Sequence, residues 1–208
     1  MRLVLASASP ARLALLRAAG IEPDVIVSNV DESTVESPDP AVLSGTLARL
    51  KAEAVAGRLK INGTGLVLGC DSVLAFEGEV LGKPASAADA TRRWRRMRGR
   101  HGVLYTGHCL IDLATGKQAA ATSATSVHWA DITDAEIDAY VATGEPLQVA
   151  GAFTIDGRGG PFVARIEGDH GTVVGLSLPL FRTLLAELGV RLTDLWAGSA
   201  DVGVADPG

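Results

Sequence analysis

Two serines and an arginine surround the predicted start of a helix near the N-terminus. Residues 5–12 read Leu-Ala-Ser-Ala-Ser-Pro-Ala-Arg, so Ser9 can cap a helix whose first position suits Pro10. The free N–H groups and the dipole of a helix start attract phosphate, and a guanidinium binds an anion through paired hydrogen bonds. Ser7, Ser9 and Arg12 are therefore candidate phosphate ligands. The competing interpretation is a plain helix cap beside a solvated arginine.

Carboxylates occur at two positions where a cation could bind. Asp71 directly follows the apolar run 66–70, which predicts a buried strand that ends at this aspartate. A carboxylate there loses solvation unless a metal, a cation or hydrogen bonds meet it. Glu32 follows Asp31 in a polar loop, and converging carboxylates with phosphate oxygens are the usual ligands of Mg²⁺ or Mn²⁺. A turn-capping aspartate and a solvated acidic loop are the alternatives.

Two lysines could supply positive charge to the same site. Lys51 lies on or beside the apolar face of a helix predicted over residues 40–59, where a lysine either extends outward to water or projects into a cleft. Lys83 stands between Gly82 and Pro84 in a rigid turn, which can present a fixed ammonium to a phosphate. Considered alone, each lysine is more simply interpreted as a solvent-exposed side chain.

The elements that must position these residues alternate between strands and helices, which predicts an α/β architecture. We expect one domain over residues 1–196 and a disordered tail over 197–208. Glu77-Gly78 and Thr115-Gly116 are the expected hairpin turns. The strands are expected at residues 3–6, 25–27, 66–70, 73–76, 80–81, 103–113, 119–129 and 162–166. Helices are expected at residues 10–19, 40–59, 87–97, 134–143 and 179–188, with capping boxes at Ser86/Asp89 and Thr133/Glu136.

Composition and charge exclude several classes of protein. The chain has 208 residues and a formal net charge of -5, so no global positive field draws it onto nucleic acid or an anionic membrane. Its two cysteines, Cys70 and Cys109, lack the spacing of a disulfide framework or a zinc site, which fits a cytoplasmic location. The opening apolar run is too short for a signal peptide, and no run is long enough to span a membrane. Six arginines crowd residues 92–100, and we interpret them as a solvated helix face or a dimer rim rather than a nucleic-acid surface.

The motifs in their order resemble the Maf family of nucleotide pyrophosphatases, which are related in fold to the inosine triphosphate pyrophosphatases. The resemblance covers about residues 3–190. It rests on the serine segment at 5–12, Val30-Asp31-Glu32, Lys51 in Leu-Ala-Arg-Leu-Lys-Ala, Gly69-Cys70-Asp71-Ser72-Val73, Leu81-Gly82-Lys83-Pro84, Tyr105-Thr106-Gly107-His108, Val149-Ala150-Gly151-Ala152-Phe153 and Val173-Val174-Gly175-Leu176.

This resemblance implies a fold, an activity and a set of roles. The fold is a long twisted mixed sheet with flanking helices and a deep cleft between two lobes, usually in a homodimer. The activity is hydrolysis of a nucleoside triphosphate to a monophosphate and diphosphate, with a divalent metal, Mg²⁺ or Mn²⁺. Asp71 would activate the attacking water and, with Glu32, hold the metal. The residues implied around the triphosphate are Ser7, Ser9, Arg12, Lys51 and Lys83.

Three positions depart from the thymidine and uridine triphosphate branch of the family. Ala11 stands where that branch has arginine, Ser72 where it has threonine, and Asp156 where it has glutamine. We therefore expect these positions to affect the choice of base and leave Asp71 untouched. Two other functions are weighed: a non-catalytic nucleotide-binding regulator of cell division, and an RNA-binding module that uses the arginine-rich helix.

Overall fold

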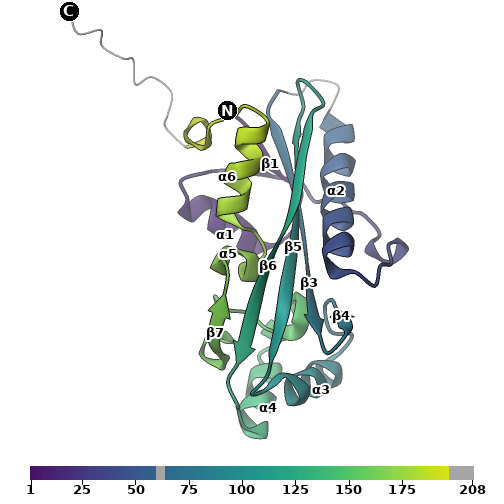
Figure 1. Ribbon diagram of the computed structural model, residues 1–208, viewed down its shortest axis with the longest axis vertical. Helices are drawn as coiled ribbons and strands as arrows, with labels where there is room; N and C mark the ends of the chain where they lie inside the picture. Colours follow the sequence, from purple (N-terminus) through teal and green to yellow (C-terminus); the bar gives the residue numbers. More distant parts are fainter. Residues whose placement is uncertain (60–63, 197–208) are drawn as a thin grey trace, which may run out of the picture.

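Three long strands run side by side through the length of the molecule. In the computed structural model, which describes residues 1–59 and 64–196, these are β3 (Leu66–Phe76), β5 (His101–Asp112) and β6 (Gln118–Trp129). β5 pairs antiparallel with β3 on one side and with β6 on the other, and β5 and β6 form one extended hairpin, as the sequence predicts (Figure 1). The mixed sheet has seven strands in the order β2-β1-β3-β5-β6-β7, with β4 paired to β3 beside this path.

The remaining strands are short and attach to the edges of this central group. β7 (Val163–Glu167) pairs with β6. On the other side, β1 (Leu3–Leu5) runs parallel to β3 at Leu66–Leu68, and β2 (Asp24–Val25) lies beyond it. The fourth short strand, β4 (Glu79–Leu81), turns back antiparallel on the last residues of β3. Since β5 occupies one edge of β3 from Leu66 to Ala75, β1 and β4 share the opposite edge.

The helices cover both faces of the sheet and its lower end. α2 (Pro40–Leu59) lies along one face, while α1 (Pro10–Ala18), α5 (His170–Val174) and α6 (Leu178–Glu187) lie on the other side of the long strands (Figure 1). α3 (Ala87–Met97) and α4 (Asp134–Ala142) close the lower end. Short 3-10 turns occur at Glu32–Thr34, Glu145–Gln148, Ala150–Ala152, Gly160–Phe162 and Leu192–Leu195.

α2 approaches the sheet so closely that only glycine fits beneath it. A Cβ atom added at Gly69 would lie 2.2 Å from the carbonyl oxygen of Ala48, and one at Gly107 would lie 2.3 Å from that of Ser44. Gly69 and Gly107 belong to neighbouring strands, so together they form a flat place on the sheet. The close contact sets the height of α2 above β3.

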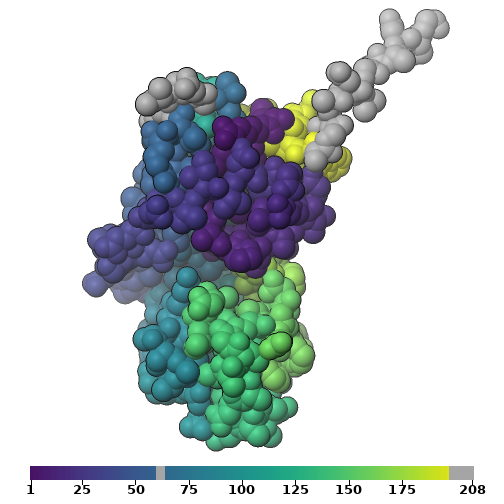
Figure 2. Space-filling model, turned by 180° about the vertical axis from the view of Figure 1, so that it is seen from behind, coloured from purple at the N-terminus to yellow at the C-terminus, as the bar shows by residue number. Residues whose placement is uncertain are grey.

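Apolar side chains are buried in three clusters that are arranged along the strands. One fills the narrow space between α2 and the sheet with small residues such as Ala48, Ala52 and Val55. Another lies beneath α1 and α6 around Leu16 and Phe181. The third fills the lower end around Trp94, Trp129 and Tyr140. Figure 2 shows the matching outer shape, an upper part made largely by the N-terminal residues and a lower part from teal to green, with a narrowing between them.

Most predicted elements are confirmed, and three expectations about them need comment. The strand expected to end at Asp71 continues to Phe76. The capping box at Ser86 is incomplete, because Ser86 accepts from the Asp89 N–H while the Asp89 carboxylate accepts from the Ala85 N–H at 3.0 Å. The predicted tail at 197–208 lies outside the described residues. None of the described helices is long and apolar enough to cross a membrane.

The close packing of α2 can be tested with two glycine-to-alanine changes. Gly69→Ala places a methyl group against the α2 backbone, so we expect the free energy of unfolding to fall by about 1–3 kcal/mol, the usual cost of overpacking. Gly57→Ala is the control, because Gly57 lies on α2 where an added Cβ meets nothing within 4 Å beyond its chain neighbours and the nearby helix backbone. Alanine is the better helix former there, and we expect stability to rise by up to about 1 kcal/mol. Urea unfolding measures both, and equal midpoints would contradict the proposed contact.

Candidate active site

The middle of β3 has an open edge into which two chain segments run. β1 ends opposite Leu68, where the Ala6 N–H donates to the Leu68 carbonyl at 2.8 Å, and the chain then enters the serine turn. β4 runs the opposite way and ends at Leu81, opposite Leu74 of β3. From there the chain continues into Gly82 and Lys83. No described strand pairs with the stretch between these points on that edge. The serine turn and the Lys83 turn therefore approach the same stretch of β3 from opposite ends, and Asp71 lies at its centre.

The Asp71 carboxylate forms a buried ion pair with Lys51 of α2. Lys51 Nζ lies 2.6 Å from Asp71 Oδ1 and 2.6 Å from Glu32 Oε1, so the ammonium bridges both carboxylates. Asp71 is 6% and Lys51 8% exposed, whereas Glu32 is exposed. Burial raises the pKa of the Asp71 carboxyl above its ordinary value, and this effect exceeds the opposing attraction of Lys51 and then Arg12.

This pair explains why the strand does not end at Asp71 as the sequence suggested. The sequence predicted a strand end here because a carboxylate directly follows the apolar run 66–70. Because α2 brings an ammonium to it, Asp71 is accommodated within β3, on the same face as Gly69. Of the two alternatives for Lys51, the structure shows the one that projects inward.

Arg12 approaches β3 from the serine turn and is buried, which contradicts the interpretation of a solvated arginine. It is 9% exposed. At least four of its five N–H donors are used within the chain, on Gly175 O at 2.7 Å, Cys70 O at 2.9 Å, and the hydroxyls of Ser7 and Ser72 at 3.1 Å each. Arg12 thus ties the serine turn, α5 and both neighbours of Asp71 together. A role for it as a phosphate ligand stays a prediction.

A chain of hydroxyl groups leads from Arg12 into the interior. Thr106 donates its proton to the Thr172 carbonyl at 2.8 Å, so Ser72 must donate its own proton to Thr106 Oγ1 across 2.8 Å. Ser72 also accepts from Arg12. The Ser72 proton is therefore used in the hydrogen bond to Thr106. Toward any ligand, the Ser72 hydroxyl can act only as an acceptor.

His108 connects β5 to the start of α6 in the interior. Its Nδ1 donates to the Thr106 carbonyl at 3.0 Å, and its Nε2 accepts the Ser177 N–H at 2.9 Å at the start of α6. The Nε2 contact requires the neutral ring, because a protonated imidazole has no free acceptor nitrogen. Burial, and then the positive charge of Arg12, lower the pKa of His108 to about 4. Cys70 is likewise interior, and burial raises the pKa of its thiol to about 12, so it suits the core rather than nucleophilic chemistry.

The structure leaves the other predicted site residues more exposed. Ser9 caps α1 by accepting the Arg12 N–H at 3.4 Å, and its own N–H donates to Ser7 Oγ at 3.1 Å. Ala11 is half-buried on the first turn of α1, and Lys83 is exposed.

Asp156 lies exposed in a loop that is joined to the Lys83 turn and held by one carboxylate. The Gly151 N–H donates to the Gly82 carbonyl at 3.1 Å. Glu145 accepts hydrogen bonds from Tyr140, Thr154, Arg158 and Gly159, on both sides of Asp156. The loop that carries Asp156 is therefore fixed at its base.

Two carboxylates of the site fit a divalent cation that arrives with a phosphate ligand. Asp71 and Glu32 both point at one ammonium, Lys51 Nζ, so a cation is already favoured between them. Within residues 1–59 and 64–196 no group of three or more His, Cys, Asp or Glu side chains could hold a metal ion. Mg²⁺ is commonly bound by one or two carboxylates together with substrate phosphates and water. The donor set agrees with that mode rather than with a complete protein cage.

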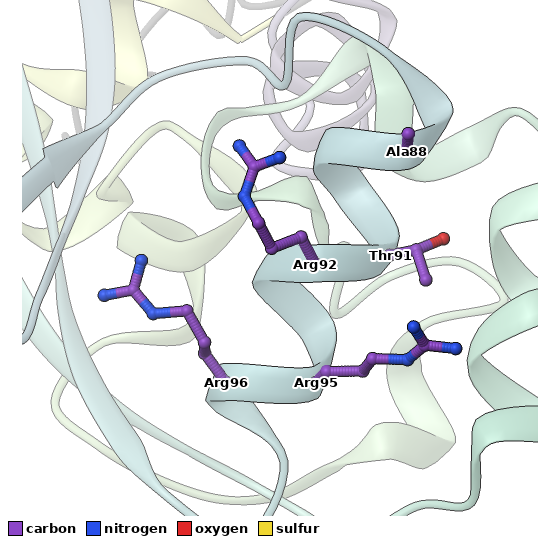
Figure 3. Close-up of a pocket in the computed structure, with 5 residues that line it drawn as sticks. All are labelled: Ala88, Thr91, Arg92, Arg95 and Arg96. Atoms are coloured by element: carbon purple, nitrogen blue, oxygen red, sulfur yellow. The ribbon is translucent and has the colours of Figure 1, made fainter.

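The arginines of α3 are paired with carboxylates rather than gathered around a ligand. Arg92 pairs with Asp89, Arg96 with Glu77 and Glu79, and Arg95 with Asp134. A shallow hollow of about 600 Å³ lies along these side chains, away from Asp71. Figure 3 shows Arg92 and Arg96 projecting to one side of the helix and Arg95 to the other. They form a mixed-charge surface and do not converge on one point.

Sequence reasoning did not assign the interior residues that support the site. Gly175 contacts Arg12, Thr106 contacts Ser72 and Thr172, and His108 contacts the start of α6, yet none of these four residues received an individual role. The available signal was a hydroxyl and an imidazole within a long apolar strand, since buried polar groups need partners.

Comparison with known proteins assigns the chain to a family. Residues 2–188 match the Maf-like protein family, and the chain belongs to it, which confirms the resemblance found in the sequence. A protein of Salinispora tropica named nucleoside triphosphate pyrophosphatase is 64% identical over 95% of this chain and 88% of the relative. Relatives with the same name from Streptomyces coelicolor and Microcystis aeruginosa are 58% and 52% identical, over 96% and 93% of this chain and 97% and 98% of theirs.

Two solved structures are similar at a lower level. The Ham1 protein of Staphylococcus aureus has a TM-score of 0.40 and 16% identity, covering 63% of this chain and 73% of that one. A nucleoside-triphosphatase described as a dITP/XTP pyrophosphatase, from Mycobacterium abscessus, has a TM-score of 0.37 and 19% identity, covering 64% and 76%. These likenesses are too remote to add to the argument.

The internal role of Arg12 predicts a loss of stability when it is removed. Arg12→Ala leaves the carbonyls of Cys70 and Gly175 without their buried donor, and each such loss costs about 1–3 kcal/mol. We therefore expect the free energy of unfolding to fall by about 2 kcal/mol or more. Arg17→Ala on the same helix is the control, because Arg17 is exposed and pairs only with exposed Glu22 among the described contacts. Equal free energies of unfolding for the two variants, measured with denaturant, would contradict the stabilising role of the Arg12 hydrogen bonds.

Proposed function

We propose that the chain is a nucleoside triphosphate pyrophosphatase, which hydrolyses the bond between the α- and β-phosphates to give a monophosphate and diphosphate. The observation that carries this proposal is the buried Asp71, paired with Lys51 and Glu32, where the serine turn and the Lys83 turn approach the open edge of β3. The names of the relatives, which are 52–64% identical to this chain, support it.

The chain's own residues would divide the reaction between them. Asp71 would orient a water molecule toward the α-phosphorus and accept its proton at the carboxylate, while Lys51 stabilises the ionised form. The N–H groups and hydroxyls of the serine turn would bind phosphate oxygens at the start of α1, and the Lys83 ammonium would bind oxygens of the phosphates that leave as diphosphate. Arg12 would keep the serine turn and the Asp71 strand in register through the contacts described above.

Asp71 and Glu32 would also hold Mg²⁺ or Mn²⁺ that enters with the triphosphate. When bound, the ion supplies positive charge to phosphate oxygens and so favours cleavage of the anhydride. Lys51 then remains as the cation that sets the direction of both carboxylates.

Replacing the Asp71 carboxylate tests the enzymatic assignment. Asp71→Asn keeps the shape but removes the base, so we expect kcat to fall by at least about 100-fold, with diphosphate and monophosphate measured together. Asp24→Asn, an equal charge change at an exposed residue of β2, should retain wild-type turnover. Normal turnover in Asp71→Asn would contradict the role of Asp71 as the base. A wild-type chain that binds triphosphates and releases no diphosphate would instead support the alternative of a division regulator.

We further propose that base preference depends on Ala11, Ser72 and Asp156. Ala11 places no long donor on the first turn of α1. Ser72 offers no proton to a base, because its proton is committed to Thr106. The exposed Asp156 carboxylate accepts hydrogen bonds and donates none when ionised, which favours base edges that carry N–H groups over the two carbonyls of thymine or uracil. The names of the three relatives specify no base.

Base preference can be measured with a panel of nucleoside triphosphates. We expect wild-type kcat/KM for thymidine and uridine triphosphates to exceed that for the best other substrate by less than about tenfold, or ~1.4 kcal/mol. Asp156→Gln introduces an amide that can donate, so it should shift the ratio toward those two substrates. Strong wild-type selectivity for thymidine or uridine triphosphate, or an unchanged ratio in the variant, would contradict the roles given to these residues.

We infer that the working protein is a cytoplasmic homodimer with one domain over residues 1–196, and that neither nucleic acid nor a membrane is its partner. The family resemblance supports the dimer, and the net charge of -5 with the paired arginines of α3 supports the lack of a nucleic-acid surface.

A further inference from the structure

One arginine of α3 differs from its neighbours in burial and in what it contacts. The side chain of Arg93 is 13% exposed, compared with 69% for Arg92 and 49% for Arg95. Its Nη1 donates to the Gly82 carbonyl at 2.7 Å, and its Nη2 lies 2.8 Å from Asp89 Oδ2. Arg93 therefore points inward, toward the turn between β4 and α3, whereas Arg92, Arg95 and Arg96 line a surface hollow along the helix (Figure 3).

Its partner Asp89 holds the other end of the same turn. Asp89 is 7% exposed, and its Oδ2 accepts the Ala85 N–H at 3.0 Å. The ion pair joins residues four apart on one helix, so the helix sets the spacing of the two groups. Gly82 and Ala85 are thus each held by one member of the pair.

Lys83 and Pro84 lie between these two fixed points. Pro84 is buried and has a restricted backbone, and Lys83 is exposed. The Gly82 carbonyl also accepts the Gly151 N–H at 3.1 Å, which joins the turn to the loop that leads to Asp156. The backbone of Lys83 is therefore supported on both sides, while its ammonium remains available to a ligand.

The direction of β4 places this supported turn toward the open edge of β3. Leu81 pairs with Leu74, and because the strands are antiparallel the chain leaves β4 toward the Asp71 end of β3. A lysine has four rotatable side-chain bonds, so a fixed backbone is the main way to limit where its ammonium goes.

From these contacts we propose that Arg93, together with Asp89, is a positioning residue that holds the Lys83 turn for binding of the triphosphate. The proposal rests on the proposed function, because it assigns Arg93 a role through the phosphate contact of Lys83. Arg93 itself touches no substrate. Arg93 thereby differs from Arg92, which shares Asp89 but has an exposed side chain, and from Arg95 and Arg96, which pair with other carboxylates.

A double-mutant cycle tests the coupling between Arg93 and Lys83. Arg93→Met keeps the length of the side chain and removes the guanidinium. Since a misplacement of about 1 Å can cost about 100-fold, we expect kcat/KM for the triphosphate to fall by about tenfold or more. The loss should come mainly through KM, because Lys83 contributes to binding. Arg95→Met, at an exposed position of the same helix with no described contact to the turn, is the matched control and should match wild type.

The effect of Arg93→Met on kcat/KM is also measured in the Lys83→Ala enzyme. This comparison distinguishes an effect through Lys83 from a general structural defect. If Arg93 acts through Lys83, adding Arg93→Met to Lys83→Ala should change kcat/KM by less than about twofold. Losses that multiply would show that Arg93 acts elsewhere, and wild-type kinetics in Arg93→Met alone would also overturn the proposal while leaving the pyrophosphatase intact. A Lys83→Ala enzyme with unchanged kcat/KM would remove the phosphate role of Lys83, and with it the role of Arg93. Failure of the proposed function is distinct, since no variant, nor the wild type, would then release diphosphate.

Discussion

The buried pair of Lys51 and Asp71 places strict demands on the surrounding structure, because taking two charges out of water costs several kcal/mol for each ion. Their attraction offsets this cost only if the helix that carries Lys51 lies at a fixed height above β3. The glycines at 69 and 107 and the small alanines of α2 permit that height, with the Cβ position of Gly69 only 2.2 Å from the α2 backbone. The tight contact between helix and sheet is thus the means by which the Lys51 ammonium reaches a buried carboxylate.

The opposite face of β3 meets a related demand with different chemistry. Arg12 donates to the carbonyl of Cys70, a group that a neighbouring strand would otherwise satisfy, and so replaces strand pairing at the open edge. Behind it, Ser72, Thr106 and His108 pass hydrogen bonds on to α5 and α6 without an ionisable group that titrates near neutral pH. Cations therefore approach Asp71 from both faces of the sheet, and both are held by contacts within the chain.

Local patterns in the sequence predicted much of this arrangement. The hairpin of β5 and β6, the Ser9 cap and the Thr133 capping box follow from residues that are near one another in the chain. The continuation of β3 past Asp71 could not be predicted in this way, because the neutralising group lies 20 residues earlier on α2. The burial of Arg12 depends on Gly175, which is 163 positions distant. The helix His170–Val174 has five residues, too few for a periodic pattern to identify it.

The long strands pass without interruption from the upper cores to the lower one, and their pairing has mechanical consequences. Between β3 and β5 the register is continuous from Leu66 to Ala75, across the level of Asp71. The two parts of the molecule are thus joined by paired strands rather than by a flexible loop. If the upper and lower parts move toward each other on binding, the hydrogen-bonded strands that join them must bend or twist along their length. The molecule would resist large closure and return to one resting shape after each departure of product.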